Sequence, residues 1–163
     1  MANYYLSTFQ SSDRAGVAEV LNSLLPDVKI EINSDKYFLY RTDLNIKKIP
    51  ENDLLRNIFI VIKKFDKLTG NYFKPIFQWG GRHSFEDILP TTKSMGYKSF
   101  RLILSEKFRV ISGHRRAVKA LERQISKQTG LKIDRVSPST EIWILHTKED
   151  YGFVMLKINK WYG

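Results

Sequence analysis

Apolar and polar residues in the first 65 positions alternate with a period of two in some segments and with a helical period in another. Val28, Ile30 and Ile32 are each followed by a polar residue, which is the pattern of a half-buried strand. Val17 and Leu21 are four positions apart, as on the apolar face of a helix. The predicted elements are, in order, a strand at 4–9, a helix between Asp13 and Pro26, strands at 28–33 and 36–42, a helix at Glu51–Arg56 and a strand at 58–65.

This order predicts a ferredoxin-like domain over residues 1–65, with an antiparallel sheet and two helices on one of its faces. The segment has no histidine and no Gly-rich loop after a strand, so we expect no chemistry in it. Tyr37, Phe38 and Tyr40 share one strand, and two uses are open for them. They either stack on nucleic-acid bases or pack in the core, which is the commoner use of such residues.

The segment 66–83 is rich in turn-forming residues but also carries four aromatic residues, too many for a free linker. We therefore predict a connector that packs against its surroundings. Gly80 and Gly81 precede Arg82, and two interpretations are open. An anion can approach a Gly-Gly backbone closely with Arg82 beside it, or the pair simply forms a turn.

The remaining residues, 84–163, predict a second α/β domain. Phe100, Leu102 and Leu104 alternate with their neighbours as in a strand, and Gly130 is placed to end a helix. The predicted elements are, in order, a short helix from Ser84 to near Pro90, a strand at 100–105, a helix at 114–128, an extended segment at 131–136, and strands at 141–147 and 151–158 joined by a hairpin turn at 148–150.

Positive charge is concentrated in this second domain. The chain has a net charge of +10, and residues 101–135, with ten basic and three acidic residues, contribute +7 of it. On a wheel of about 100° per residue, the helix at 114–128 has an apolar face and a cationic face within an arc of roughly 120°. The cationic face consists of Arg115, Arg116, Lys119, Arg123 and Lys127.

Like charges at this spacing repel each other, and a polyanion would relieve that repulsion. The charge therefore favours nucleic acid as a partner, and the alternative is a solvated face that keeps the protein soluble. The apolar face of the helix is small and aliphatic, which argues against insertion into a membrane.

Composition excludes several classes of protein. Hydrophobic residues make up 42% of the 163 residues and aromatic residues 13%, which is ample for packed cores. The absence of cysteine excludes disulfides and thiolate metal sites. The start of the chain has no basic stretch leading into an apolar segment, and no apolar run approaches the roughly 18 residues of a membrane span, so we expect a cytoplasmic protein.

Candidate catalytic chemistry is weak. His83, His114 and His146 share no spacing typical of metal ligands, and the chain has no Gly-x-Ser-x-Gly motif. We therefore expect no catalytic residue, metal or cofactor in this chain. His114, next to Arg115, is expected either to support a phosphate contact or to pack at the start of the helix, and His146 to be a satisfied strand residue.

The second domain resembles a known family of RNA-binding domains. It reads SFRLIL, then the basic helix, then TGLKIDRVSPSTEIWI and a last apolar strand ending in LKI. These residues resemble the THUMP domain of thiouridine synthases, RNA methylases and pseudouridine synthases, which commonly follows an N-terminal ferredoxin-like domain. The most family-like positions are Thr129, Gly130, Lys132, Ile133, Asp134, Pro138, Glu141 and Ile142.

The resemblance implies binding of tRNA or other structured RNA, at the acceptor stem and its 3′ end, on behalf of a catalytic domain. It is strongest to the N-terminal part of RNA methylases, which implies S-adenosylmethionine as the cofactor of a methyltransferase domain in cis. This chain has neither the DPxxGxG nor the NPPY motif of such a domain.

We therefore expect an N-terminal fragment of an RNA methyltransferase. The alternatives are a stand-alone RNA-binding or protein-interaction adaptor and a small nucleic-acid-modifying enzyme in its own right. The predicted RNA-binding residues are Arg82, Lys107, Arg109, His114, Arg115, Arg116, Lys119, Arg123, Lys127 and Arg135.

Overall fold

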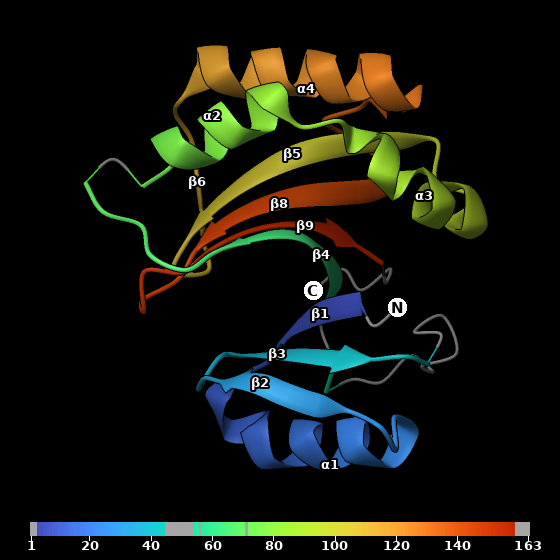
Figure 1. Cartoon of the computed structure of the whole chain (residues 1–163), viewed down its shortest axis with the longest axis vertical. Coiled ribbons are helices and arrows are strands. Elements are labelled where there is room, and N and C mark those ends of the chain that lie inside the picture. The colour runs from blue at the N-terminus through green and yellow to red at the C-terminus, as the bar shows by residue number, and fades with distance from the viewer. Residues whose placement is uncertain (1–2, 45–53, 56, 71, 159–163) are drawn as a thin grey trace. The chain divides into compact units, whose positions relative to one another are not determined.

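The structure, a computed structural model, describes residues 3–44, 54–55, 57–70 and 72–158 of the chain. Contacts between residues divide it into two units. The first unit comprises Met1–Val61 and Lys157–Gly163, and the second comprises Ile62–Leu156. Each unit combines strands with helices (Figure 1), which confirms the predicted α/β fold class.

The first unit follows the ferredoxin-like order as far as it is described. Its elements are β1 (Asn3–Thr8), the 3-10 turn η1 (Ser11–Asp13), α1 (Arg14–Leu24), β2 (Lys29–Asn33), β3 (Tyr37–Thr42) and β4 (Asn57–Phe65), whose last residues belong to the second unit. The strand order is β2-β3-β1-β4, and neighbouring strands are antiparallel. Strand β3 thus lies between β1 and β2, as in a split β-α-β unit. Residues 51–53 and 56 of the predicted helix at Glu51–Arg56 lie outside the described residues, so the structure does not test this helix.

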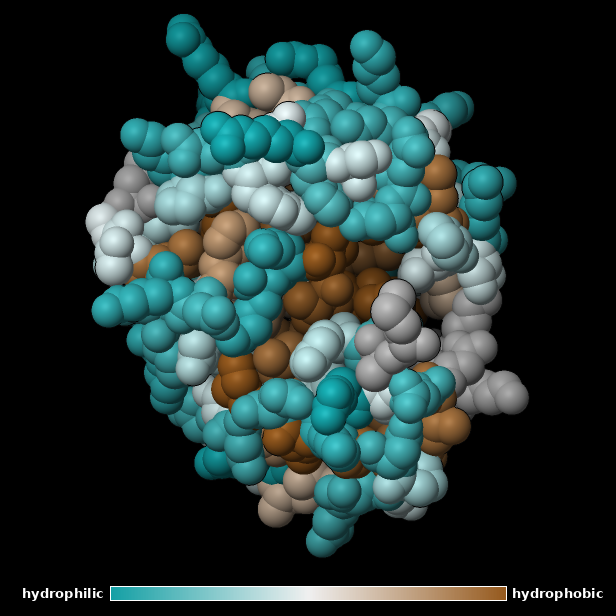
Figure 2. All heavy atoms as spheres, in the orientation of Figure 1, coloured by the Kyte–Doolittle hydropathy of each residue, from teal (hydrophilic) through white to brown (hydrophobic). Residues whose placement is uncertain are grey.

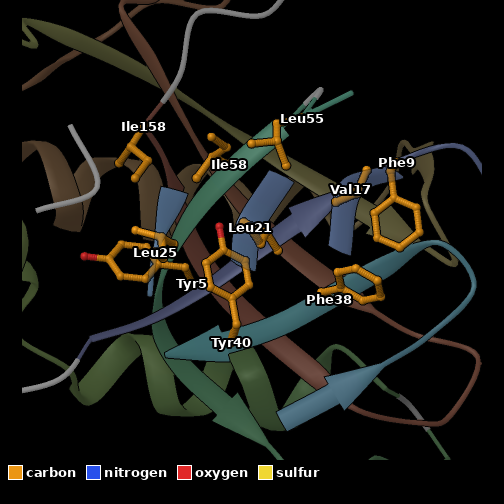
Figure 3. Close-up of a cluster of buried hydrophobic side chains, with 10 residues drawn as sticks. All are labelled: Tyr5, Phe9, Val17, Leu21, Leu25, Phe38, Tyr40, Leu55, Ile58 and Ile158. Atoms are coloured by element: carbon orange, nitrogen blue, oxygen red, sulfur yellow. The ribbon is translucent and has the colours of Figure 1, made fainter. Parts of the chain in front are cut away.

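Helix α1 covers one face of this sheet, and the apolar positions predicted for it form the core. Val17 and Leu21 are fully buried and meet aromatic residues from β1 and β3 (Figure 3). Phe38 and Tyr40 point into this cluster, and the Tyr40 hydroxyl lies 2.7 Å from Ser7 Oγ. Of the two uses open for the aromatic residues of β3, the structure therefore confirms core packing.

The second unit is built on β5 and holds the basic helix. Its elements after β4 are α2 (Lys74–Arg82), the 3-10 turn η3 (Phe85–Ile88), α3 (Leu89–Met95), β5 (Ser99–Glu106), β6 (Arg109–Ile111), α4 (Arg115–Thr129), β7 (Lys132–Ile133), β8 (Thr140–His146) and β9 (Gly152–Lys157). The strand order is β4-β9-β8-β5-β6, with β7 pairing with β5.

Helix α4 crosses from one parallel strand to another. Strand β5 is parallel to β8 and to β7, whereas β6 and β9 are antiparallel to their partners. A connection between parallel strands must cross a face of the sheet, and α4 makes this crossing. Figure 1 shows α2, α3 and α4 on the same face of the sheet, so the opposite side of α4 is free to face solvent.

Of the two interpretations open for Gly80 and Gly81, the structure contradicts the turn, and the approach of an anion stays a prediction. Both residues lie inside α2, which occupies half of the segment 66–83 that was expected to be a connector. Pro75, one of the turn-forming residues noted in the segment 66–83, lies in the first turn of α2, where proline is tolerated because its missing N–H has no helical partner. A Cβ at Gly80 would lie 3.1 Å from Leu121 Cδ1, so this glycine lets α2 approach α4 closely.

The helix predicted from Ser84 to near Pro90 also differs. A 3-10 turn at Phe85–Ile88 leads directly into α3, and Pro90 lies in the first turn of α3 instead of ending a helix. Strand β6 was not predicted, since three residues are too few to show a period. The predicted ranges 1–65, 66–83 and 84–163 remain a prediction about folding domains.

Candidate nucleic-acid interface

Helix α4 positions half of the predicted RNA-binding residues. Its apolar residues Leu121 and Ile125 are buried, and Gln124 Nε2 donates a 2.7 Å hydrogen bond to the carbonyl oxygen of Gly80 on α2. Gly130 follows the last turn with a φ of 78°, a left-handed conformation that glycine adopts without strain. The expected glycine at the end of the helix is therefore confirmed. The contacts of Leu121, Gln124 and Ile125 attach one side of α4 to the rest of the unit.

The opposite side of α4 is cationic. All five residues predicted for this face are exposed, and no carboxylate lies within ion-pair distance of them in the described part of the chain. Figure 2 shows hydrophilic side chains across the top of the view, the region where α4 lies in Figure 1. The five residues are Arg115, Arg116, Lys119, Arg123 and Lys127.

Glu122, the one acid in the sequence of α4, lies on the buried side of the helix. Its side chain is 2% exposed, and its Oε1 accepts a 2.9 Å hydrogen bond from Arg135 Nη2. The Arg135 side chain is 60% exposed, so its guanidinium is held at one edge and open to solvent elsewhere. The outer face of α4 therefore carries only positive charge, while Arg135 is partly neutralised.

A small cavity at the start of α4 brings three of the predicted cations together. Its volume is about 220 Å³, and it is lined by Gly113, Arg115, Val118, Lys119, Glu122 and Arg135. The helix begins at His114 without a side-chain cap, and the first backbone N–H groups of a helix carry partial positive charge. Cationic side chains at this end raise the local potential further, which suits an anion such as a phosphate group.

The other predicted cations lie apart from this cavity. Lys107 and Arg109 are exposed at the turn between β5 and β6, and Arg82 is exposed in the last turn of α2. Lys107 and Phe108 have φ values of 50° and 68°, as in the tight turns of β-hairpins. The Lys107 N–H also donates a 2.7 Å hydrogen bond to the carbonyl oxygen of His146, so the turn is a fixed one.

His114 packs at the start of α4. Its ring centroid lies 5.5 Å from that of Phe73 and 5.9 Å from that of Phe77. Of the two roles expected for His114, the structure supports packing, and a phosphate contact stays a prediction.

A second, larger groove contains two lysines that the sequence analysis did not predict to bind RNA. Its volume is about 770 Å³, and it is lined by Lys98, Ser99, Gly130, Lys132, Ile133, Asp134, Arg135 and Val136. Lys98 and Lys132 are 34 positions apart, and the pairing of β5 with β7 brings them together, since the Lys132 N–H donates a 3.0 Å hydrogen bond to the Lys98 carbonyl oxygen. No periodic pattern in the sequence signals such a pair.

The remaining histidines have structural partners. His83 Nε2 lies 2.7 Å from Asp87 Oδ2, and the buried His146 lies 2.9 Å from Asp150 Oδ1 and stacks on Tyr72 at a centroid distance of 4.0 Å. The described residues include no group of three or more acidic, histidine or cysteine side chains placed to hold a metal ion. None of the helices in the described residues has both the length and the apolarity needed to cross a bilayer.

Sequence comparison does not assign this chain to a family. No family model matches it, and no curated protein matches it. Comparison of folds is informative, because solved structures resemble nearly the whole chain.

Three solved structures illustrate this similarity of fold. TrmN from Thermus thermophilus has a TM-score of 0.63 at 12% identity, over 97% of this chain and 46% of that one. A 4-thiouridine synthetase, solved with RNA and ATP, has a TM-score of 0.57 at 14% identity, over 98% and 42%. A protein assigned as a methyltransferase, in complex with SAH, has a TM-score of 0.60 at 19% identity, over 96% and 41%.

This chain therefore spans less than half the length of each of these three proteins. At identities this low, the TM-scores establish a shared fold and nothing further. The resemblance to the THUMP architecture stated from the sequence is consistent with this result.

Proposed function

We propose that this chain is the RNA-binding module of an RNA-modifying enzyme. The observation that carries the proposal is the outer face of α4, on which five cations project without a neighbouring carboxylate in the described residues. A solvated helix gains from pairs of opposite charge, whereas this face suffers a repulsion of a few tenths of a kcal/mol for each like-charged neighbour. Phosphate groups of RNA would offset that repulsion and release bound counterions.

The finer parts of the proposal follow from the THUMP resemblance. The RNA is a tRNA or a similarly structured RNA, and the contact is with the acceptor stem and its 3′ end. The reaction is methylation, carried out in the cytoplasm by a methyltransferase domain of the same polypeptide with S-adenosylmethionine. We assign no residue of this chain to that cofactor, because the proposal places it on the catalytic domain.

Fold similarity supports the partner and the class of enzyme. One protein of similar fold is described with RNA, and another, assigned as a methyltransferase, with SAH. The ten predicted cationic and histidine residues are exposed, as RNA-binding residues must be. Arg115, Lys119 and Arg135 form the centre of the proposed interface, since they share one cavity.

Charge reversal on α4 tests the proposal. Arg116, Lys119 and Arg123 are replaced together by glutamate, and binding to tRNA is measured by fluorescence anisotropy. All three side chains are exposed, so we expect the melting temperature to change little. RNA affinity is expected to fall by roughly tenfold or more, because phosphate contacts are lost and each new carboxylate repels the RNA backbone.

A matched control separates position from net charge. Lys29, Lys36 and Lys93 are also exposed, and replacing all three by glutamate changes the net charge equally. We expect this control to bind tRNA nearly as well as the original chain. Equal losses in both variants would mean that overall charge is responsible, and normal binding by the α4 variant would leave only a solvated helix face.

A further inference from the structure

We propose that the groove beside β7 binds one nucleotide of a single-stranded RNA segment, whose backbone continues into the cavity at the start of α4. Lys98 and Lys132 would contact the phosphates in the groove, and Arg135 would contact the backbone where the two sites meet. This inference rests on the proposed function and adds to it a path for the strand and two contact residues. The first observation is that Arg135 lines both the 220 Å³ cavity and the 770 Å³ groove.

The two lysines are held close together by the backbone. Strands β5 and β7 are parallel, with Ser99 opposite Lys132, and the Lys132 N–H bonds to the Lys98 carbonyl oxygen. The N–H groups of Lys98 and Ser99 both donate to Ser139 Oγ, at 2.8 and 2.9 Å. These bonds fix the chain at the base of the groove, so little ordering of the backbone is needed when a ligand binds.

Arg135 is held at both its side chain and its backbone. Glu122 accepts a hydrogen bond from the guanidinium, and Arg101 Nη1 donates a 3.5 Å bond to the Arg135 carbonyl oxygen. Arg101 is itself paired with Glu141, so it is fixed in turn. A guanidinium whose position is set by a buried carboxylate can still donate hydrogen bonds from its other N–H groups. Glu122 therefore acts as a positioning residue for Arg135.

Groove size indicates what each site accepts. Ligand sites for small molecules typically have volumes of roughly 300–1,000 Å³, a range that includes the 770 Å³ groove but not the 220 Å³ cavity. The groove is thus large enough for a nucleotide, and the cavity suits a phosphate group. Val136, 88% exposed, and the half-buried Ile133 add an apolar surface against which a base can lie. Only an unstacked base can make such a contact, which favours a single strand.

The one acidic residue that lines the groove, Asp134, already accepts hydrogen bonds from the backbone. Asp134 Oδ1 accepts hydrogen bonds from the N–H groups of Val136 and Ser137, at 3.0 and 2.9 Å. The carboxylate therefore shapes the loop that carries Val136, and three cations outnumber it in the groove. An anionic backbone remains the ligand that the net charge favours.

The test uses the Lys98→Ala, Lys132→Ala double variant and a single-stranded hexaribonucleotide. Two lost phosphate contacts are expected to make the negative slope of log K against log salt shallower by about 1.4, and to lower the affinity at about 0.1 M salt by roughly tenfold or more. A blunt-ended RNA duplex, which offers no unpaired nucleotide, is expected to bind the double variant as it binds the original chain. The control is the Lys36→Ala, Lys93→Ala variant, which should behave as the original chain with both RNAs.

Unchanged binding of the hexamer by the groove variant, with binding still lost in the α4 variant, would overturn this inference and leave the proposed function standing. If the original chain bound neither RNA, both proposals would fall. A loss of equal size for the hexamer and the duplex would also overturn the inference, since it would show a general charge effect.

Glu122→Gln tests the positioning role, because a change in charge alone and a loss of positioning would alter RNA affinity in opposite directions. The substitution removes one negative charge, so a purely electrostatic surface would bind the hexamer more tightly. If Glu122 positions Arg135, binding is instead expected to weaken, roughly fivefold for one misplaced charge-assisted contact. Tighter or unchanged binding would contradict the positioning role, provided that the melting temperature shows a folded protein.

Discussion

Two adjacent glycines on α2 have different surroundings and should tolerate a side chain differently. Gly81 is exposed, and a Cβ added there would meet no atom within 4 Å, whereas a Cβ at Gly80 would press on Leu121. Alanine also costs less conformational entropy than glycine in a helix. We therefore expect Gly81→Ala to raise the free energy of unfolding by roughly 0.5–1 kcal/mol, measured by urea denaturation.

Gly152→Ala is the matched substitution, and it is expected to lower the free energy of unfolding. A Cβ at Gly152 in β9 would lie 2.7 Å from Leu68 Cδ1 and 3.2 Å from Phe65 Cβ, so the core of the second unit would have to move. Overpacking of this kind typically costs about 1–3 kcal/mol. If Gly81→Ala and Gly152→Ala changed the free energy of unfolding equally, the result would contradict the close packing around Gly152.

Glu122 shows what a sequence pattern omits at the scale of a residue. The helical wheel placed the cationic residues of α4 on an exposed face correctly, because exposure follows from the helical period. The partner of Glu122, however, is Arg135, which lies 13 positions away beyond the end of the helix. Lys98 and Lys132 were missed for the same reason, since only the pairing of β5 with β7 brings them together.

At the scale of the element, long periodic segments were predictable and short irregular ones were not. Strands β1 to β5, β8 and β9 and helices α1 and α4 lie within a few residues of their predicted ranges. Both errors in helix placement involve proline. Pro75 was interpreted as a turn former and Pro90 as the end of a helix, and each lies in the first turn of a helix. A proline in the first turn and one that ends a helix look alike in sequence, and the residues that follow decide between them.

The loop after β7 should respond to pH. Hydrogen bonds from the N–H groups of Ser137 and Val136 hold the pKa of Asp134 below its ordinary value. Because they stabilise the ionised form, their contribution is complete above about pH 4 and is lost as the pH falls through the lower pKa of the folded state. We expect the amide resonances of Val136 and Ser137 to shift in an NMR titration below about pH 4.

Asp134→Asn is the control for this titration. Asparagine keeps an acceptor oxygen at the same position but does not ionise in this range. The two amide resonances should then stay constant with pH. A titration that persisted in this variant would mean that another group controls the loop.

At the scale of the whole molecule, salt dependence measures how many phosphates the protein contacts. If α4 and Arg135 meet about four to six phosphates, the slope of log K against log salt should be roughly −3 to −5. Isothermal titration with tRNA at several salt concentrations gives this slope directly. A slope near zero would contradict phosphate contacts altogether, whatever the affinity.

The preference of the protein between nucleic acids distinguishes an RNA-binding module from a basic patch. Phosphate contacts carry no sequence information, so α4 by itself would bind any polyanion. RNA differs from DNA in the shape of its duplex, its 2′-hydroxyls and its unpaired ends, and the groove beside β7 is proposed to read an unpaired nucleotide. We therefore expect tRNA-like RNA with a single-stranded 3′ end to compete better than duplex DNA of equal length. Pairing the 3′ end with a complementary strand should remove part of this advantage, and equal competition by all three would leave only a non-specific cationic surface.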